Sequence, residues 1–67
     1  MTEKLVRDLK KEEWFTLKPI EDPKESQVWV RGEYDRISKT YGVNNYGDYN
    51  KERFFKGDKK VYVDFTF

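Results

Sequence analysis

The sequence predicts a small, mostly β domain, and three observations carry that prediction. Short runs rich in Val, Tyr, Phe and Trp recur along the chain, and the last of them alternates apolar with polar residues. Gly, Pro, Asn and Asp separate the runs, as expected of turns. Aromatic residues make up 18% of the chain against 36% for all hydrophobic residues, so large rings can supply much of a core. At 67 residues, the chain forms a single domain, residues 1–67.

The first element has two interpretations. Its apolar residues have helical spacing, but a strand over Lys4–Arg7 followed by a turn over Asp8–Lys11 explains them equally well. We favour the strand and turn. The alternative is an α+β fold in which residues 2–12 form a helix packed on the sheet.

Four later runs are predicted as strands because they are rich in β-branched and aromatic residues. They are Glu13–Ile20, Gln27–Tyr34, Lys39–Val43 and Lys60–Phe67. Asp35–Ser38 is predicted as a hairpin connection, and Gly32 predicts a bulge or bend within its strand. The best-phased apolar faces place Val30, Val63 and Phe65 in the core.

One short helix is predicted over 49–56. Asp48 would cap its first turn, and Gly57 would end it with a positive φ. The complete prediction is a small curled antiparallel sheet of four to five strands with this one helix. Such a sheet covers its apolar face most simply as a small barrel of the SH3-like or OB-like kind.

The residue types exclude most catalytic chemistry. The chain has no cysteine and no histidine, which removes disulfides, zinc fingers and iron–sulfur sites. Its two serines, Ser26 and Ser38, lie outside any nucleophile motif, and no phosphate-binding glycine motif is present. We therefore expect a protein that is not an enzyme and that has no metal and no cofactor.

Aromatic rings are predicted on both faces of the sheet. Alternation points Trp14 and Tyr62 outward when their apolar neighbours face the core. Trp29 and Arg31 share a face opposite the two valines of their strand. The candidate interaction surface comprises Trp14, Trp29, Arg31, Arg36 and Tyr62.

Three interpretations of these outward rings remain open. Other parts of the chain cover them, or a protein partner or a second copy does, or they stack on single-stranded nucleic acid beside basic residues. The net charge is only +1, and Glu33 and Asp35 interleave with Arg31 and Arg36. Because nucleic-acid-binding domains are usually clearly basic, we favour a protein-interaction module, with a homodimer as one form of it. Binding of single-stranded nucleic acid is the alternative.

The N-terminal stretch contains no apolar run of the length found in signal peptides, and no segment approaches the length of a membrane span. The sequence therefore predicts a cytoplasmic protein without a membrane partner.

The chain contains the patterns L-x-x-x-E-W-F-x-L-K at Leu9–Lys18, V-W-V-R-G-x-Y-x-R at Val28–Arg36 and F-x-K-G-D-K-x-V-Y-V-D-F at Phe54–Phe65. Together they resemble a family of small bacterial β-domain proteins of unknown function. The resemblance implies a bacterial origin and a β fold, and it brings no catalytic residue, cofactor or substrate. In similar domains the turn before the aromatic strand is often K-K-G-[DE]. Here Glu12 stands at the glycine position, which disfavours a tight turn over Lys10–Glu13.

Overall fold

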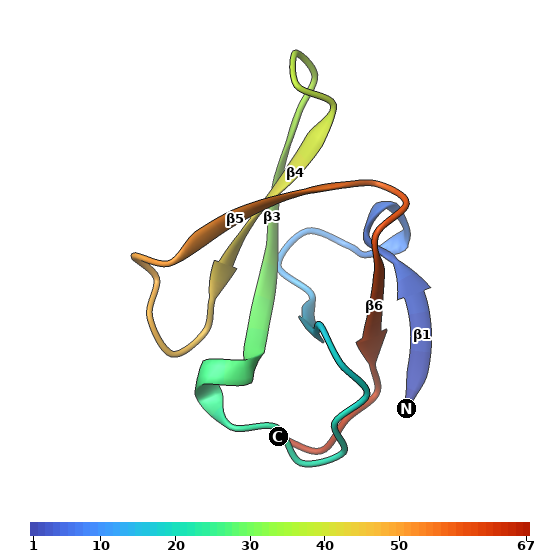
Figure 1. The fold of residues 1–67 in the computed structure, drawn as a ribbon, viewed down its shortest axis with the longest axis vertical. Helices are drawn as coiled ribbons and strands as arrows, with labels where there is room; N and C mark the ends of the chain where they lie inside the picture. The colour runs from blue at the N-terminus through green and yellow to red at the C-terminus, as the bar shows by residue number, and fades with distance from the viewer.

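A computed structural model describes residues 1–67 of the chain. Its six strands form one antiparallel sheet (Figure 1). The strands are β1 (Thr2–Leu5), β2 (Trp14–Thr16), β3 (Val28–Asp35), β4 (Thr40–Asn45), β5 (Glu52–Lys56) and β6 (Lys60–Val63). Their order in the sheet is β1-β6-β2-β3-β4-β5. Two single 3₁₀ turns, η1 (Val6–Asp8) and η2 (Glu25–Gln27), are the only helical segments. The prediction of a mostly β fold is confirmed.

The sheet is open rather than closed into a barrel. β1 pairs only with β6 and β5 pairs only with β4, so these two strands form the edges. The chain nevertheless passes from edge strand β5 to β6, which lies next to the other edge strand, through only residues 57–59 (Figure 1). η1 is tied to this connection, because Val6 N donates to Lys59 O at 3.0 Å and Arg7 N to Gly57 O at 3.1 Å.

The N-terminal residues form a strand followed by a turn, as favoured above, but both begin earlier than predicted. β1 covers Thr2–Leu5, and η1 (Val6–Asp8) takes the place of the second half of the strand predicted over Lys4–Arg7. The alternative of an N-terminal helix does not hold. Pairing with β6 supplies the backbone hydrogen bonds of β1 from outside the segment. No helical segment of the chain is long and apolar enough to cross a membrane.

The helix predicted over 49–56 is wrong. Residues Glu52–Lys56 form β5, which pairs with β4 along its whole length, including Gly42 with Phe54. Asp48 stabilises a turn instead, since its Oδ1 accepts from Asn50 N at 3.0 Å. No glycine has a positive φ, so Gly57 is not the predicted left-handed terminator. An isolated helix of this length is marginal, and strand pairing offers the same backbone groups better partners.

The bulge predicted at Gly32 is confirmed. The β3–β4 register shifts between Arg31 and Tyr34, so that Gly32 and Glu33 lie opposite Gly42 alone. A Cβ atom at Gly32 would lie 2.6 Å from Gly42 O, which is closer than any side chain tolerates. The bulge therefore requires glycine, and it brings the two strands close together.

Two strands are shorter than predicted. β2 contains only Trp14–Thr16, after which Pro19 prevents regular pairing. β6 ends at Val63 because Asp64 takes a left-handed conformation with φ of 61°. The C-terminal residues 64–67 follow as irregular chain that lies close to the β2–β3 connection, where Thr66 N donates to Glu21 O at 2.9 Å.

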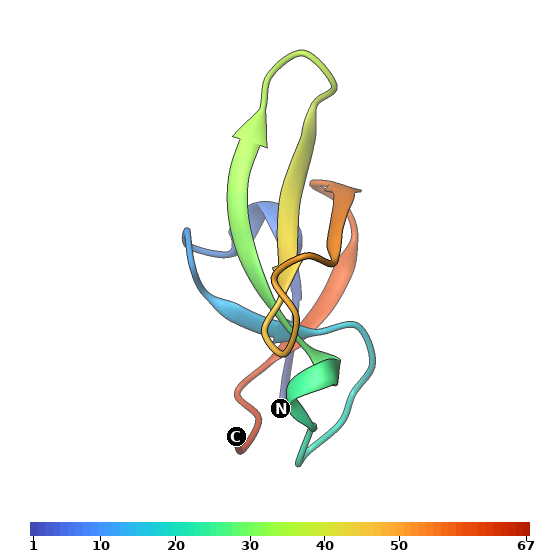
Figure 2. The same ribbon diagram turned by 90° about the vertical axis from the view of Figure 1, so that its left-hand side faces the viewer.

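The core lies on one side of the central strands and combines residues from η1 to β6. Its buried members are Val6, Leu9, Phe15, Trp29, Val43, Val61 and Val63. Val63 is buried as predicted, but Val30 and Phe65 are only half-buried. Val30 faces the other side of β3, where the sheet carries an open groove. Figure 2 shows the β3–β4 hairpin extending beyond the rest of the sheet.

Candidate interaction groove

A groove of about 940 Å³ runs over the face of β2–β5 opposite the core. One cross-strand row crosses it, because Trp14 pairs with Val30, Val30 with Asn44, and Asn44 with Glu52. Residues paired in this way point to the same face of a sheet. The remaining lining residues are Lys11, Glu12, Arg31, Gly32, Glu33, Tyr34, Asp35, Arg36, Ile37, Gly42, Tyr49 and Phe54. We call this surface the β2–β5 groove.

Two glycines shape the floor of the groove. Gly32 and Gly42 meet at the bulge, and neither carries a side chain to fill the space above. A Cβ atom added at Gly42 would lie 3.3 Å from Cε1 of Phe54, so the ring of Phe54 lies across this glycine. The Phe54 side chain remains 59% exposed and forms the wall on the β5 side.

Trp14 forms the opposite wall and is held by two other rings. Its centroid lies 5.1 Å from Tyr46 and 5.4 Å from Phe67, and both contacts are edge-to-face. Tyr46 and Phe67 also contact each other at 5.1 Å. Such contacts restrict the indole, yet it stays 42% exposed beside the groove. Trp14 is therefore a rigid, accessible ring.

The upper end of the groove is the β3–β4 hairpin turn. Ile37 at its tip is 95% exposed and has no apolar cover. Asp35 orders the turn, because its Oδ1 accepts a hydrogen bond from Ile37 N at 2.9 Å. This bond, with others from Ser38, holds the pKa of Asp35 below its ordinary value. The tip thus presents an aliphatic side chain on an ordered turn.

An ion pair crosses the rim between the β1–β2 connection and β3. Lys11 Nζ contacts Glu33 Oε1. The hydrogen bond and charge of Lys11 lower the pKa of Glu33, and those of Glu33 raise the pKa of Lys11. Including this pair, four acidic and three basic residues line the groove. Its lining is therefore close to neutral, with one acid in excess.

Three of the predicted site residues line the groove together. Trp14 of β2 and Arg36 of the hairpin turn lie at this surface. Arg31 of β3 contributes to the lining, but it pairs with the core residue Val43, so its side chain points toward the core face of the sheet. The guanidinium carbon of Arg31 lies 4.6 Å from the centroid of the Tyr41 ring, and its Nη1 donates to Gly32 O at 2.8 Å. Its Nε is buried without a hydrogen-bond partner.

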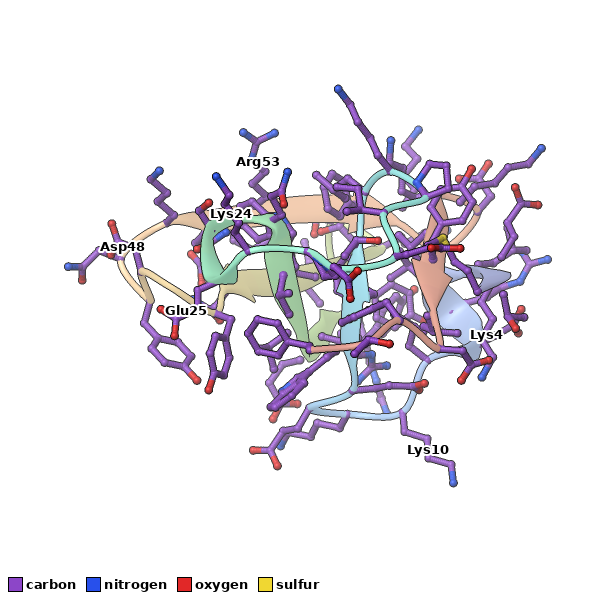
Figure 3. All side chains as sticks on the ribbon, turned by 90° about the horizontal axis from the view of Figure 1, so that it is seen from below. Lys4, Lys10, Lys24, Glu25, Asp48 and Arg53 are labelled. Atoms are coloured by element: carbon purple, nitrogen blue, oxygen red, sulfur yellow. The ribbon has the colours of Figure 1, made fainter.

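The assignment of Trp29 to an outward interaction surface is wrong. Trp29 pairs with Phe15, is only 6% exposed and belongs to the core. Arg53, which extends from β5 in Figure 3, closes over it with the guanidinium carbon 5.3 Å from the ring centroid. Val28, Trp29 and Val30 are all apolar, so the sequence of β3 does not alternate between apolar and polar residues. Only the pairing with Phe15 therefore decides which face of β3 is buried.

Tyr62, the remaining candidate, lies outside the groove. It is half-buried, and its hydroxyl donates to Glu3 Oε1 at 3.4 Å across the β6–β1 pair. Sequence reasoning missed Tyr34, Ile37, Tyr49 and Phe54 as groove residues. Gly32 and Gly42 could have pointed to Phe54, because a glycine within a strand indicates that a neighbouring group approaches closely.

No group of three or more acidic residues is placed to hold a metal ion. Comparison with protein-family models, with curated proteins and with solved structures finds no match for this chain. The resemblance to small bacterial β-domain proteins therefore stays a prediction.

Proposed function

We propose that this chain is a small, non-enzymatic protein-interaction module whose β2–β5 groove receives an extended segment of a protein partner. The observation that carries the proposal is the concentration of exposed apolar side chains around one open groove. Trp14, Ile37, Tyr49 and Phe54 all line it, and each is at least 42% exposed. Exposed apolar patches of this kind mark interaction sites in soluble domains.

The charge of the groove supports a protein partner over nucleic acid. A strand of nucleic acid is bound through a positive channel, whereas this lining has one carboxylate in excess. Rigid aromatic walls with a polar rim are typical of the central residues of protein interfaces.

The groove carboxylates also support a non-enzymatic role. Glu33 is paired with Lys11, and Asp35 accepts hydrogen bonds from its own turn. Both interactions lower the pKa of the carboxyl groups. A general acid working near neutral pH needs the opposite shift, so these two groups suit a structural role.

A displayed library of random extended peptides tests the proposal. We expect the native protein to enrich a family of sequences, and Trp14→Ala and Phe54→Ala to lose that enrichment, because removal of a central ring costs about 2 kcal/mol or more of binding. Tyr62→Phe, altered outside the groove, should enrich the same family. Far-UV circular dichroism confirms that each variant is folded. Equal enrichment by the two groove variants would contradict the proposal.

The nucleic-acid alternative has its own measurement. The tryptophan fluorescence of the native protein is followed during titration with oligo-dT and oligo-dA at low salt. We expect no change up to about 100 µM, the weak limit of ordinary non-specific binding. A quench that disappears as salt is added would replace the peptide proposal with the nucleic-acid alternative.

A further inference from the structure

The free edge of β5 carries unpaired backbone groups. Asn45 N donates to Lys51 O at 3.0 Å, directly before the β4–β5 pairs. Hydrogen-bonded pairs in an antiparallel ladder recur at every second residue, so Arg53 and Phe55 direct their backbone groups toward β4. Glu52, Phe54 and Lys56 direct theirs toward the free edge. The carbonyl of Lys56 accepts from Lys59 N in the following turn, but its N–H remains free.

The side chains of this edge are self-complementary. When two antiparallel copies of β5 pair across a two-fold axis at Phe54, each Glu52 lies opposite Lys56 of the other copy, and the two Phe54 rings lie opposite each other. In this register the three residues whose backbone groups face the free edge pair only with one another. An antiparallel ladder requires this, because backbone groups form hydrogen bonds only when both partners direct them toward each other. Both Glu52 and Lys56 are exposed and have no ion-pair partner within the chain. Opposite charges and aromatic pairs directly across strands stabilise a sheet.

The other edge lacks this complementarity. β1 reads Thr2-Glu3-Lys4-Leu5. In an antiparallel ladder, two residues that lie opposite each other both direct their backbone groups toward the partner strand or both direct them away from it. Any register of two β1 copies that meets this condition and pairs three of these residues therefore places Glu3 opposite Glu3 or Lys4 opposite Lys4. Like charges directly opposite each other destabilise the pair. Self-pairing is therefore favoured at β5 and opposed at β1.

We propose that two copies of this chain associate through β5, antiparallel and centred on Phe54, to form one continuous sheet. This inference deepens the proposed interaction role by naming a second copy as one partner. Because Glu52 and Phe54 also line the β2–β5 groove, and the two-fold axis runs perpendicular to the sheet, the two grooves join on the same face of the dimer. Charged edges normally prevent association, and here pairing with the opposite charge removes that protection.

Sedimentation equilibrium over a range of concentrations tests the dimer. We expect the native protein to form dimers, and Lys56→Glu or Glu52→Lys to raise the dissociation constant about ten-fold or more, since each creates two like-charge pairs. An equimolar mixture of the two variants should form a heterodimer at near-native affinity, because both opposite-charge pairs are restored. Lys10→Glu makes the same change in charge as Lys56→Glu. Lys10 extends from the side of the molecule opposite Arg53 of β5 (Figure 3), so this variant should dimerise normally.

Amide hydrogen exchange identifies the edge that pairs. The Phe54 and Lys56 amides should become protected as the protein concentration rises, while the outer amides of β1 should not. A native protein that stays monomeric up to about 1 mM overturns the proposal. So does a dimer that tolerates both charge reversals, or one that protects β1.

Peptide binding in the β2–β5 groove and dimerisation through β5 can be contradicted independently of each other. Peptide selection is performed at a protein concentration below the measured dimer dissociation constant. A monomeric protein that still selects groove-dependent peptides removes only the β5 dimer. A β5 dimer that selects no peptide removes only the peptide-binding role of the groove.

Discussion

The buried side chain of Asn45 donates from Nδ2 to the carbonyl oxygen of Ser26 at 2.9 Å, which joins the end of β4 to η2. The Oδ1 of the same side chain accepts from Gly47 N at 3.0 Å and Asp48 N at 3.2 Å. One amide thus satisfies backbone groups on two connections. These bonds order the start of the loop between β4 and β5, and this loop carries Tyr49 of the groove.

Replacement of Asn45 should destabilise the protein through these bonds. Asn45→Asp keeps the shape but turns the Nδ2 donor into an oxygen that faces the Ser26 carbonyl. We expect a loss of about 1–3 kcal/mol in the free energy of unfolding, measured by urea denaturation. Asn50→Asp, at an exposed position in the same loop, is the matched control and should change little. Equal losses for both variants would show that the buried amide has no special role.

The two faces of the sheet should respond differently to removal of a phenylalanine ring. Phe15 is fully buried in the core, so Phe15→Ala should cost about 3–5 kcal/mol of stability. Phe54 is mostly exposed, so Phe54→Ala should cost less than about 1 kcal/mol. Thermal and urea unfolding of both variants measure the difference. A Phe54→Ala variant as unstable as Phe15→Ala would mean that the groove wall is part of the core.

The turn before β2 should be improved by glycine. Glu13 N donates to Lys10 O at 3.1 Å, so the tight turn over Lys10–Glu13 does form, and Glu12 accommodates it with a φ of 70°. Glycine takes this conformation without the penalty that a Cβ atom imposes. We expect Glu12→Gly to raise the free energy of unfolding by about 1 kcal/mol. Glu12→Ala removes the same carboxylate but keeps the Cβ atom, and it should bring no such gain; equal effects would assign the change to charge.

The rim ion pair should be visible in the titration of Glu33. Its pKa is lowered mainly by the hydrogen bond to Lys11, so Lys11→Gln should bring it back toward the ordinary value of 4.5. The pKa of Asp35 is lowered mainly by the backbone hydrogen bond from Ile37, so it should stay low in the same variant. Carboxyl chemical shifts followed by NMR measure both groups. If the pKa of Glu33 is the same in the native protein and in Lys11→Gln, the ion pair does not form in solution.

The pair also predicts how stability depends on pH. Because the pKa of Glu33 is lower in the folded state, its contribution is present above pH 4.5 and is lost as the pH falls through the folded value. Because the pKa of Lys11 is raised, its contribution is present below pH 10.5 and is lost as the pH rises through the folded value. Both residues are at the surface, so salt should weaken the effect. Comparison of native and Lys11→Gln unfolding across these two windows checks it.

Local residue preferences are sufficient to predict the fold class and several local features. Runs of β-forming residues between turn formers predicted a mostly β domain, and the structure confirms it. The first residues form a strand and a turn, although both begin earlier than predicted, and Gly32 forms the predicted bulge. Trp14 points away from the core as its alternation with Phe15 predicted. These features depend on local preferences or on an unambiguous period of two, so neighbouring residues are sufficient to specify them.

The remaining features depend on strand partners that are distant in the sequence, so local preferences do not predict them. Apolar residues occupy both faces of β3, so pairing of Trp29 with Phe15 placed the indole in the core and left Val30 facing the groove. The segment at 52–56 became a strand because β4 offered an edge with Gly42 opposite Phe54. The β2–β5 groove follows from both choices. A period read along one strand cannot reveal the neighbouring strand that covers it, and that neighbour determines which face is buried.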